Sequence, residues 1–305
     1  MYFISLPDHT KSDFNEEAHF SKFRKHNIIF NALSTNSHCD YHVGCLSIKT
    51  VLSGEEWYGI SHRRLAIRPG KFLILNDDQP YSCHIANAGS VRTLSVFFKK
   101  EFASSVFQDA VANEETLLDN PFCTGGKTPE FLQTLNDIDP MMHQQLCGLI
   151  ISLNKWGYDN FRVDEYLVFL LHHLIRVHQS DVKRLGNVKA LKPNTRAEIY
   201  KRVCVAKDII HSNYKDKLDL NAVSAAACLS IPQLIRQFKS VFKTTPHQYL
   251  CGIRLRHAEE LLIRTTKPVS EITWECGFEN TSAFCRAFKS AYGARPGSFR
   301  LRKTC

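Results

Sequence analysis

The chain has 305 residues, of which 44% are hydrophobic and 23% are charged, and this composition is typical of a globular protein with room for two cores. No apolar run reaches the length of about 18 residues that a transmembrane helix needs, and the first residues lack the pattern of a secretory signal. The 11 cysteines include no Cys-x-x-Cys pair, so neither a metal cage nor a disulfide framework is expected. These features predict a reduced, cytoplasmic protein without a membrane segment.

Charge is unevenly distributed along the chain. Residues 194–305 contain 19 Lys and Arg against 9 Asp and Glu, whereas residues 1–193 contain 20 against 21. A basic region beside a nearly neutral one favours a phosphate-rich partner for the basic part. A solvated basic surface without a partner would give the same counts, so the motifs must decide.

Short strands separated by turn residues dominate the first third of the chain. Ser53-Gly54, Pro69-Gly70 and Asn76-Asp77-Asp78 are among the turn signals. The predicted strands are His26–Leu33, Val43–Leu52, Phe72–Leu75, Tyr81–Ile85 and Val91–Phe98. Many short strands at this spacing predict a barrel or a sandwich.

Helical periodicity begins after the strands. Met141–Trp156 and Val163–Val177 are predicted helices, and the second carries a wide apolar stripe. Its main members are Leu167, Leu170, Leu171 and Leu174. A stripe this wide predicts dimerisation through these leucines, unless the helix at Met141–Trp156 covers them within the same chain.

Residues 179–197 contain Gly, Pro, Asn and scattered basic residues without an apolar period, and we interpret them as a linker. The predicted organisation is a sensor and dimerisation domain at 1–178, the linker, and an all-helical domain at 198–305. The fold class is therefore α+β with two domains.

The helical domain contains an internal repeat. LIRQFKSVFKTTP, Leu234 to Pro246, aligns with FCRAFKSAYGARP, Phe284 to Pro296, at an offset of 50 residues. Each copy follows a short apolar helix and a tight turn, and this order is the plan of a helix-turn-helix. The sequence therefore predicts two helix-turn-helix units.

A helical wheel separates a buried face from an outward face in the second helix of each unit. The outward positions are Pro232, Ile235, Arg236 and Lys239 in the first copy, and Ser282, Cys285, Arg286 and Lys289 in the second. Arg can bond guanine in the major groove through two hydrogen bonds, Lys suits phosphate, and an apolar side chain can touch a thymine methyl. Two matching outward Arg and Lys pairs in a basic domain favour double-stranded DNA as the partner over a plain helical bundle.

This region resembles the AraC/XylS family of bacterial transcription regulators. The matching positions are Arg254, Leu255, Ala258, Leu261 and Leu262, then Ile272, Gly277 and Phe278, and finally Pro296, Phe299 and Arg300. The sequence departs from the family in having Ser224 and Thr273 where Ala is usual, and Lys243 where Gly is usual after the first recognition helix. The Lys243 turn is therefore expected to be strained or differently closed.

The resemblance implies a sequence-specific transcription regulator that is not an enzyme and has no cofactor. By carry-over, base contacts come from Pro232, Ile235 and Arg236 in the first unit and from Thr281, Ser282 and Arg286 in the second. The family also implies an N-terminal cupin-like β-barrel that binds a small-molecule effector, a homodimer, and RNA polymerase as a further partner. Whether transcription rises or falls stays open.

We expect the effector to be an organic molecule held without a metal. Aromatic and polar side chains among the strands commonly line such sites, and Trp57, Tyr58, His84 and Arg92 are the candidates.

Three alternatives stay open at this point. A metal-dependent cupin enzyme would need grouped ligands, but the chain has no His-x-His pair. A redox-sensing regulator could use Cys285, because neighbouring Arg286 and Lys289 favour a thiolate. A regulator without an effector would have its barrel filled by side chains.

Overall fold

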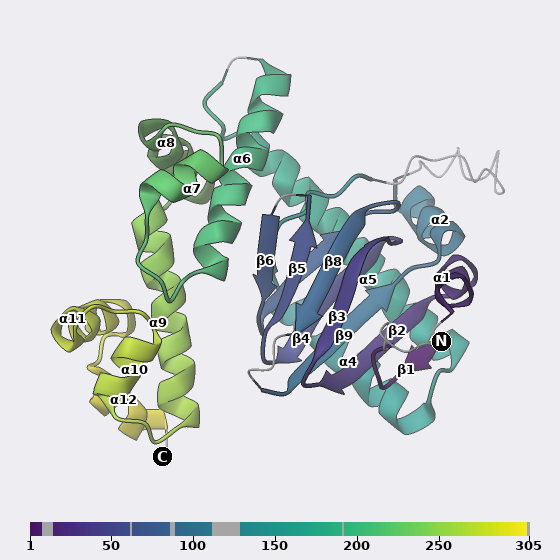
Figure 1. Cartoon of the computed structure of the whole chain (residues 1–305), viewed down its shortest axis with the longest axis horizontal. Coiled ribbons are helices and arrows are strands. Elements are labelled where there is room, and N and C mark those ends of the chain that lie inside the picture. Colours follow the sequence, from purple (N-terminus) through teal and green to yellow (C-terminus); the bar gives the residue numbers. More distant parts are fainter. Residues whose placement is uncertain (8–14, 62, 86–88, 112–128, 191, 304–305) are drawn as a thin grey trace. The chain divides into compact units, whose positions relative to one another are not determined.

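The structure is a computed structural model that describes residues 1–7, 15–61, 63–85, 89–111, 129–190 and 192–303. It separates into an N-terminal unit, Met1–Lys183, and a C-terminal unit, Arg184–Cys305 (Figure 1). The N-terminal unit combines strands with helices and the C-terminal unit is helical, so the predicted two-domain α+β organisation is confirmed. No helix among the described residues is both long enough and apolar enough to span a membrane.

The strands of the N-terminal unit form two sheets. The larger sheet has the order β1 (Tyr2–Phe3), β2 (Ile28–Ser34), β9 (Val91–Phe97), β4 (Ser47–Ser53), β7 (Lys71–Leu75) and β10 (Asn136–Asp137). The smaller sheet has the order β3 (Ser37–Val43), β8 (Pro80–Ile85), β5 (Glu56–Ile60) and β6 (Arg63–Ile67). Only β1 and β2 pair in parallel; the other pairings are antiparallel within the described strands.

The predicted cupin-like barrel takes the form of these two sheets. Among the described strands, no pairing joins one sheet to the other, so a closed barrel is not formed. Buried side chains of both sheets, among them Val51, Leu73, Tyr58 and Leu65, share one hydrophobic cluster, and the sheets therefore pack face to face. The five predicted strands correspond to β2, β4, β7, β8 and β9, whereas β1, β3, β5, β6 and β10 were not predicted.

Helices cover the other face of the larger sheet. Ile48, Leu94 and Val96 on the sheet share a cluster with side chains from three helices: α2 (Lys100–Val111), α4 (Pro140–Trp156) and α5 (Asn160–Leu185). Figure 1 shows α4 and α5 crossing behind the strands. A further helix, α1 (Glu16–Lys25), contributes Phe23 to a smaller cluster at the edge of the larger sheet.

The leucines predicted to form a dimer interface are inside this core. Leu167, Leu170, Leu171 and Leu174 are each 0% exposed, and they pack with Met142, Leu146 and Leu149 of α4. The prediction of dimerisation through these four side chains is therefore wrong. Their stripe is wide because α5 contacts the sheet and α4 at the same time.

The C-terminal unit consists of seven helices within its described residues. They are α6 (Pro193–Ser212), α7 (Leu220–Ala226), α8 (Ile231–Phe242), α9 (Pro246–Arg264), α10 (Val269–Glu275), α11 (Thr281–Tyr292) and α12 (Pro296–Lys303). Helix α9 contacts α6 and α8 as well as α10, α11 and α12, so it joins two helical groups (Figure 1). Because α5 continues to Leu185 and α6 begins at Pro193, both helices extend into the segment predicted as the linker.

Candidate nucleic-acid interface and cavity

The first helix-turn-helix unit is formed by α7 and α8. Cys228, at φ 50°, turns the chain between the helices, and Ser230 caps α8 by accepting a hydrogen bond from the Gln233 N–H. The Gln233 side chain in turn accepts a hydrogen bond from the Ser230 N–H, which completes a capping box. Arg202 on α6 donates a hydrogen bond of 2.9 Å to the Cys228 carbonyl and so holds the turn in place.

Helix α8 presents the predicted contact residues outward. Leu234, Phe238 and Val241 are buried, whereas Pro232, Ile235, Arg236 and Lys239 are exposed. Ile235 is 37% exposed although it is apolar, so it is available to an apolar contact. This is the face that the helical wheel assigned to DNA.

The second unit repeats this arrangement in α10 and α11. Asn280 caps α11 by accepting a hydrogen bond of 2.7 Å from the Ala283 N–H. Ser282, Arg286 and Lys289 are exposed, Thr281 is half-buried, and the buried side is formed by Phe284 and Phe288. Cys285 is half-buried against the core of the unit.

The turn of the second unit requires glycine. Gly277 has φ +79°, and the position that a Cβ would occupy overlaps the Lys215 carbonyl in the loop after α6. The Arg254 side chain on α9 binds the same loop, with hydrogen bonds of 2.7 Å to the Tyr214 carbonyl and 2.6 Å to the Asp216 carbonyl. The loop after α6 therefore contacts both the connecting helix and the turn of the second unit.

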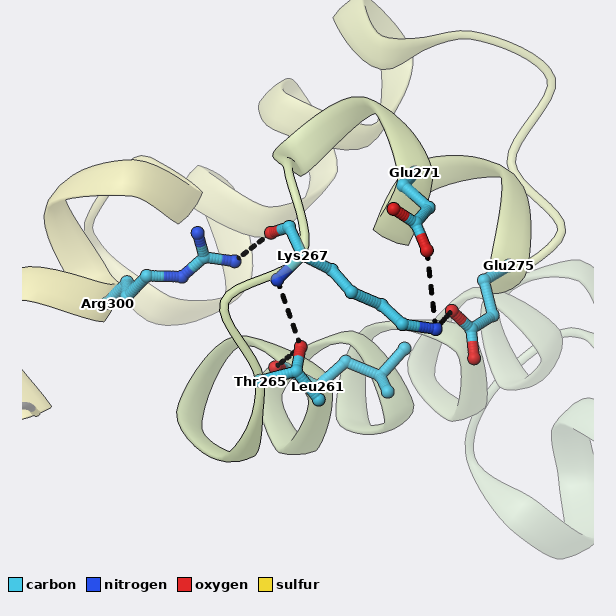
Figure 2. A network of polar contacts seen from close by, with 6 residues as sticks. All are labelled: Leu261, Thr265, Lys267, Glu271, Glu275 and Arg300. Carbon is cyan, nitrogen blue, oxygen red and sulfur yellow. Dashed lines mark hydrogen bonds and ion pairs between the residues drawn. The ribbon is translucent and has the colours of Figure 1, made fainter.

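A polar network ties α12 to the junction of α9 and α10 (Figure 2). The Arg300 guanidinium donates to the Lys267 carbonyl, and Thr265 Oγ1 accepts a hydrogen bond of 3.4 Å from the Lys267 N–H. The Lys267 ammonium group lies 2.7 Å from Glu275 and 3.4 Å from Glu271 on α10. Its hydrogen bond to Glu275 raises the pKa of Lys267. These contacts fix the turn that leads into the second unit.

Lys243 closes α8 in the same way as Gly293 closes α11. Their φ angles are 60° and 71°, and their backbone N–H groups bond the carbonyls of Lys239 and Lys289. The departure from the family pattern therefore leaves the closure unchanged, with a lysine in a left-handed conformation.

The N-terminal unit contains a cavity of about 420 Å³ between the two sheets. Of the predicted ligand residues, Tyr58 lines it. Trp57 and His84 point to the opposite face of the smaller sheet, where Arg64 lies beside both, and Arg92 bonds Asn31. Because successive side chains alternate between the faces of a strand, Trp57 and Tyr58 cannot both face the cavity.

Two charged side chains of the cavity were not predicted from the sequence. Lys49 on β4 and Glu56 on β5 are 2% and 3% exposed, and both line it. In the sequence, each of them could have been recognised as a charged residue within a strand that is otherwise buried. Among the described residues, no group of three or more His, Cys, Asp and Glu side chains has the geometry to hold a metal ion.

The C-terminal unit is similar to domains of known proteins. Residues 223–302 match a family profile described as a helix-turn-helix domain. The chain is 26% identical over 196 residues to LumQ of Photobacterium leiognathi, which is named a probable transcriptional regulator, and the match covers 62% of this chain and 73% of LumQ. It is 36% identical over 86 residues to the HTH-type transcriptional regulator MtrA of Neisseria gonorrhoeae, covering 28% of this chain but only 29% of MtrA.

Among solved structures, a transcriptional regulator of Chromobacterium violaceum with an AraC-type DNA-binding domain is 25% identical. The match covers 33% of this chain and 91% of that chain, with a TM-score of 0.32. The profile match spans both helix-turn-helix units, and both curated relatives are named as transcription regulators. Residues 223–302 therefore form a helix-turn-helix domain that is similar to those of AraC-type transcription regulators.

Proposed function

We propose that this chain is a transcription regulator that reads double-stranded DNA with α8 and α11. The observation that carries the proposal is the pair of exposed faces, in which Arg236 and Lys239 occupy the same helical positions as Arg286 and Lys289 fifty residues later. Base edges would meet the arginines together with Pro232, Ile235, Thr281 and Ser282. The lysines would meet phosphates.

The connecting helix supports a two-part site. Helix α9 has 19 residues, which correspond to about 28 Å at a rise of about 1.5 Å per residue. Major grooves on one side of a duplex recur about every 34 Å. A rigid helix of this length suits two recognition elements that enter neighbouring turns of the groove.

We also propose that the cavity of the N-terminal unit holds a small-molecule effector. Its volume of about 420 Å³ falls within the range of small-molecule sites. Since the side chains of this unit leave such a space, a regulator without an effector is less favoured. Formation of a homodimer, contact with RNA polymerase and action in the cytoplasm remain predictions.

Salt dependence of DNA binding tests the proposal. The full chain should bind DNA with an affinity that falls steeply as salt rises, because phosphate contacts release counterions. Lys239→Ala and Lys289→Ala should each weaken binding on all sequences and reduce the slope of log affinity against log salt by about one. Lys155→Ala, in the exposed part of α4, is the matched control and should leave the slope unchanged. Binding without salt dependence would contradict the proposal.

A further inference from the structure

The cavity between the sheets contains two opposite charges that are not paired with each other. Lys49 projects from the larger sheet and Glu56 from the smaller sheet, and both are almost fully buried. Among the described residues, no ion pair within 4.0 Å joins them, although each influences the charge of the other. Burying either charge without a partner is unfavourable.

Glu56 has an unused acceptor in this space. Tyr58 hydrogen-bonds the carboxylate, yet oxygen Oε2 is buried and has no hydrogen-bond partner in the described part of the chain. Desolvation by burial raises the pKa of Glu56. An unsatisfied buried acceptor calls for a donor from a ligand.

Aromatic rings lie over the Lys49 ammonium group, and the thiols of Cys39, Cys45 and Cys83 are also near enough to act on its charge. The ammonium nitrogen lies 3.3 Å from the centroid of the Phe97 ring and 5.2 Å from that of Tyr81. These cation–π contacts stabilise the charge but accept no hydrogen bond. The ammonium group therefore retains donors for an anionic partner.

Aromatic rings form part of the remaining wall, whereas the other charged lining residues, Arg24, Asp77, Asp78, Lys100 and Glu101, are exposed or half-buried. Phe30, Phe97 and Tyr81 line the cavity, and Phe23 of α1 packs edge-on against Phe97 with ring centroids 4.7 Å apart. Such walls favour a flat apolar group, since aromatic pairs gain stacking or edge-to-face contacts in addition to buried area.

We propose that this cavity binds a free α-amino acid with an aromatic side chain, whose carboxylate pairs with Lys49 and whose ammonium group pairs with Glu56. A ligand with only a carboxylate would leave Glu56 Oε2 unsatisfied and bring a second negative charge close to it. A ligand with only an amine would leave the Lys49 ammonium group without an acceptor and bring a second positive charge close to it. A neutral apolar ligand would leave both charges unpaired, so only a zwitterion satisfies the pair. This inference deepens the effector part of the proposed function and rests on it.

Calorimetric titration of the full chain separates these ligands. The probes are L-phenylalanine, 3-phenylpropanoate, which lacks the amine, and 2-phenylethylamine, which lacks the carboxylate; L-tyrosine and L-tryptophan with their matching analogues complete the set. At least one amino acid should bind at least ten times more tightly than both of its analogues. If none does, the proposal is wrong.

Two variants test which side chain pairs with which group of the ligand. Glu56→Gln should abolish the preference for the amino acid over the carboxylate analogue, and Lys49→Met should abolish the preference over the amine. The analogue that each variant still binds reports that the cavity remains folded. Glu165→Gln, on the exposed part of α5, should leave both preferences intact. Preferences that survive both cavity variants would overturn the assignment.

The same preparations separate this inference from the proposed function. Salt-sensitive DNA binding with no amino-acid binding would refute the ligand and leave DNA binding standing. Amino-acid binding without any DNA binding would support the ligand and refute the regulator.

Discussion

Lys243 adopts a left-handed backbone conformation, which residues other than glycine rarely occupy. At φ 60° it corresponds to Gly293 in the second unit, and a Cβ in this left-handed region costs about 1–2 kcal/mol. Lys243→Gly should therefore raise the free energy of unfolding by about 1 kcal/mol in urea denaturation. Lys243→Ala keeps the Cβ and loses only the Lys243 Nζ bond to the Ser240 carbonyl, so it should give no gain. If both variants gained the same free energy of unfolding, the left-handed backbone at Lys243 would not be the source of strain.

Glu56 should make stability depend on pH. Burial raises its pKa above the ordinary 4.5, so its contribution to stability is complete below that value and is lost as pH rises through the higher folded pKa. Glu56→Gln should therefore gain stability relative to the parent between pH 5 and pH 8, by about 1.4 kcal/mol for each unit of the shift. Urea unfolding at both pH values measures this difference. Lys49 also contributes to it, because loss of the Glu56 charge lowers the pKa of Lys49 further.

Glu165→Gln is the control for this comparison. Glu165 is exposed on α5, so the variant should differ from the parent by the same amount at pH 5 and at pH 8. A difference for Glu56→Gln that shrinks as pH rises would show that the carboxylate is stabilised by a partner rather than desolvated.

The residues of the two sites differed in how well the sequence predicted them. The outward positions of α8 and α11 follow from a helical period, and the exposure of Arg236 and Arg286 agrees with it. In the strands, Trp57 was predicted as a ligand residue and Glu56 was not. Glu56 indicates a ligand site only once it is known that Lys49, with the opposite charge, lies across the cavity on the other sheet.

At the scale of elements, the second turn depends on contact with the loop after α6. Gly277 and Gly293 both have positive φ, but only Gly277 meets backbone atoms at its Cβ position, whereas Gly293 faces open space. Gly293→Ala should cost about 1–2 kcal/mol in free energy of unfolding. Gly277→Ala should cost clearly more, because the Lys215 backbone must move.

Thermal unfolding of the two glycine variants gives the comparison. If the two variants lost the same stability, the second turn would not pack against the loop after α6, and the arrangement described for Arg254 and Gly277 would be wrong.

Helix α5 illustrates what an apolar stripe can and cannot reveal. The leucine pattern located the helix but not its partner, since a stripe that faces a sheet and a neighbouring helix has the same width as one that faces a second chain. The end of α5 at Leu185 was missed because its last turns carry Lys183 and Arg184 and no apolar period. The segment after it is anchored, since the Gln237 side chain on α8 exchanges two hydrogen bonds with the Lys189 backbone.

At the scale of the whole molecule, the sequence repeat predicted the helical unit almost completely, whereas the sheet pairing depended on contacts between distant strands. The larger sheet places β9 between β2 and β4, an order that local periodicity does not contain. The presence of strands was accordingly confirmed, whereas the cupin-like barrel was not.

Each recognition helix is expected to read its own part of the DNA site. The most direct measurement is selection of bound sequences from a random duplex library by the full chain and by Arg236→Ala and Arg286→Ala. We expect a two-part site in which each variant loses base preference in a different part, at a cost of about 1–3 kcal/mol. If each variant instead weakens binding equally on all sequences, the arginines contact only phosphate and this expectation is wrong.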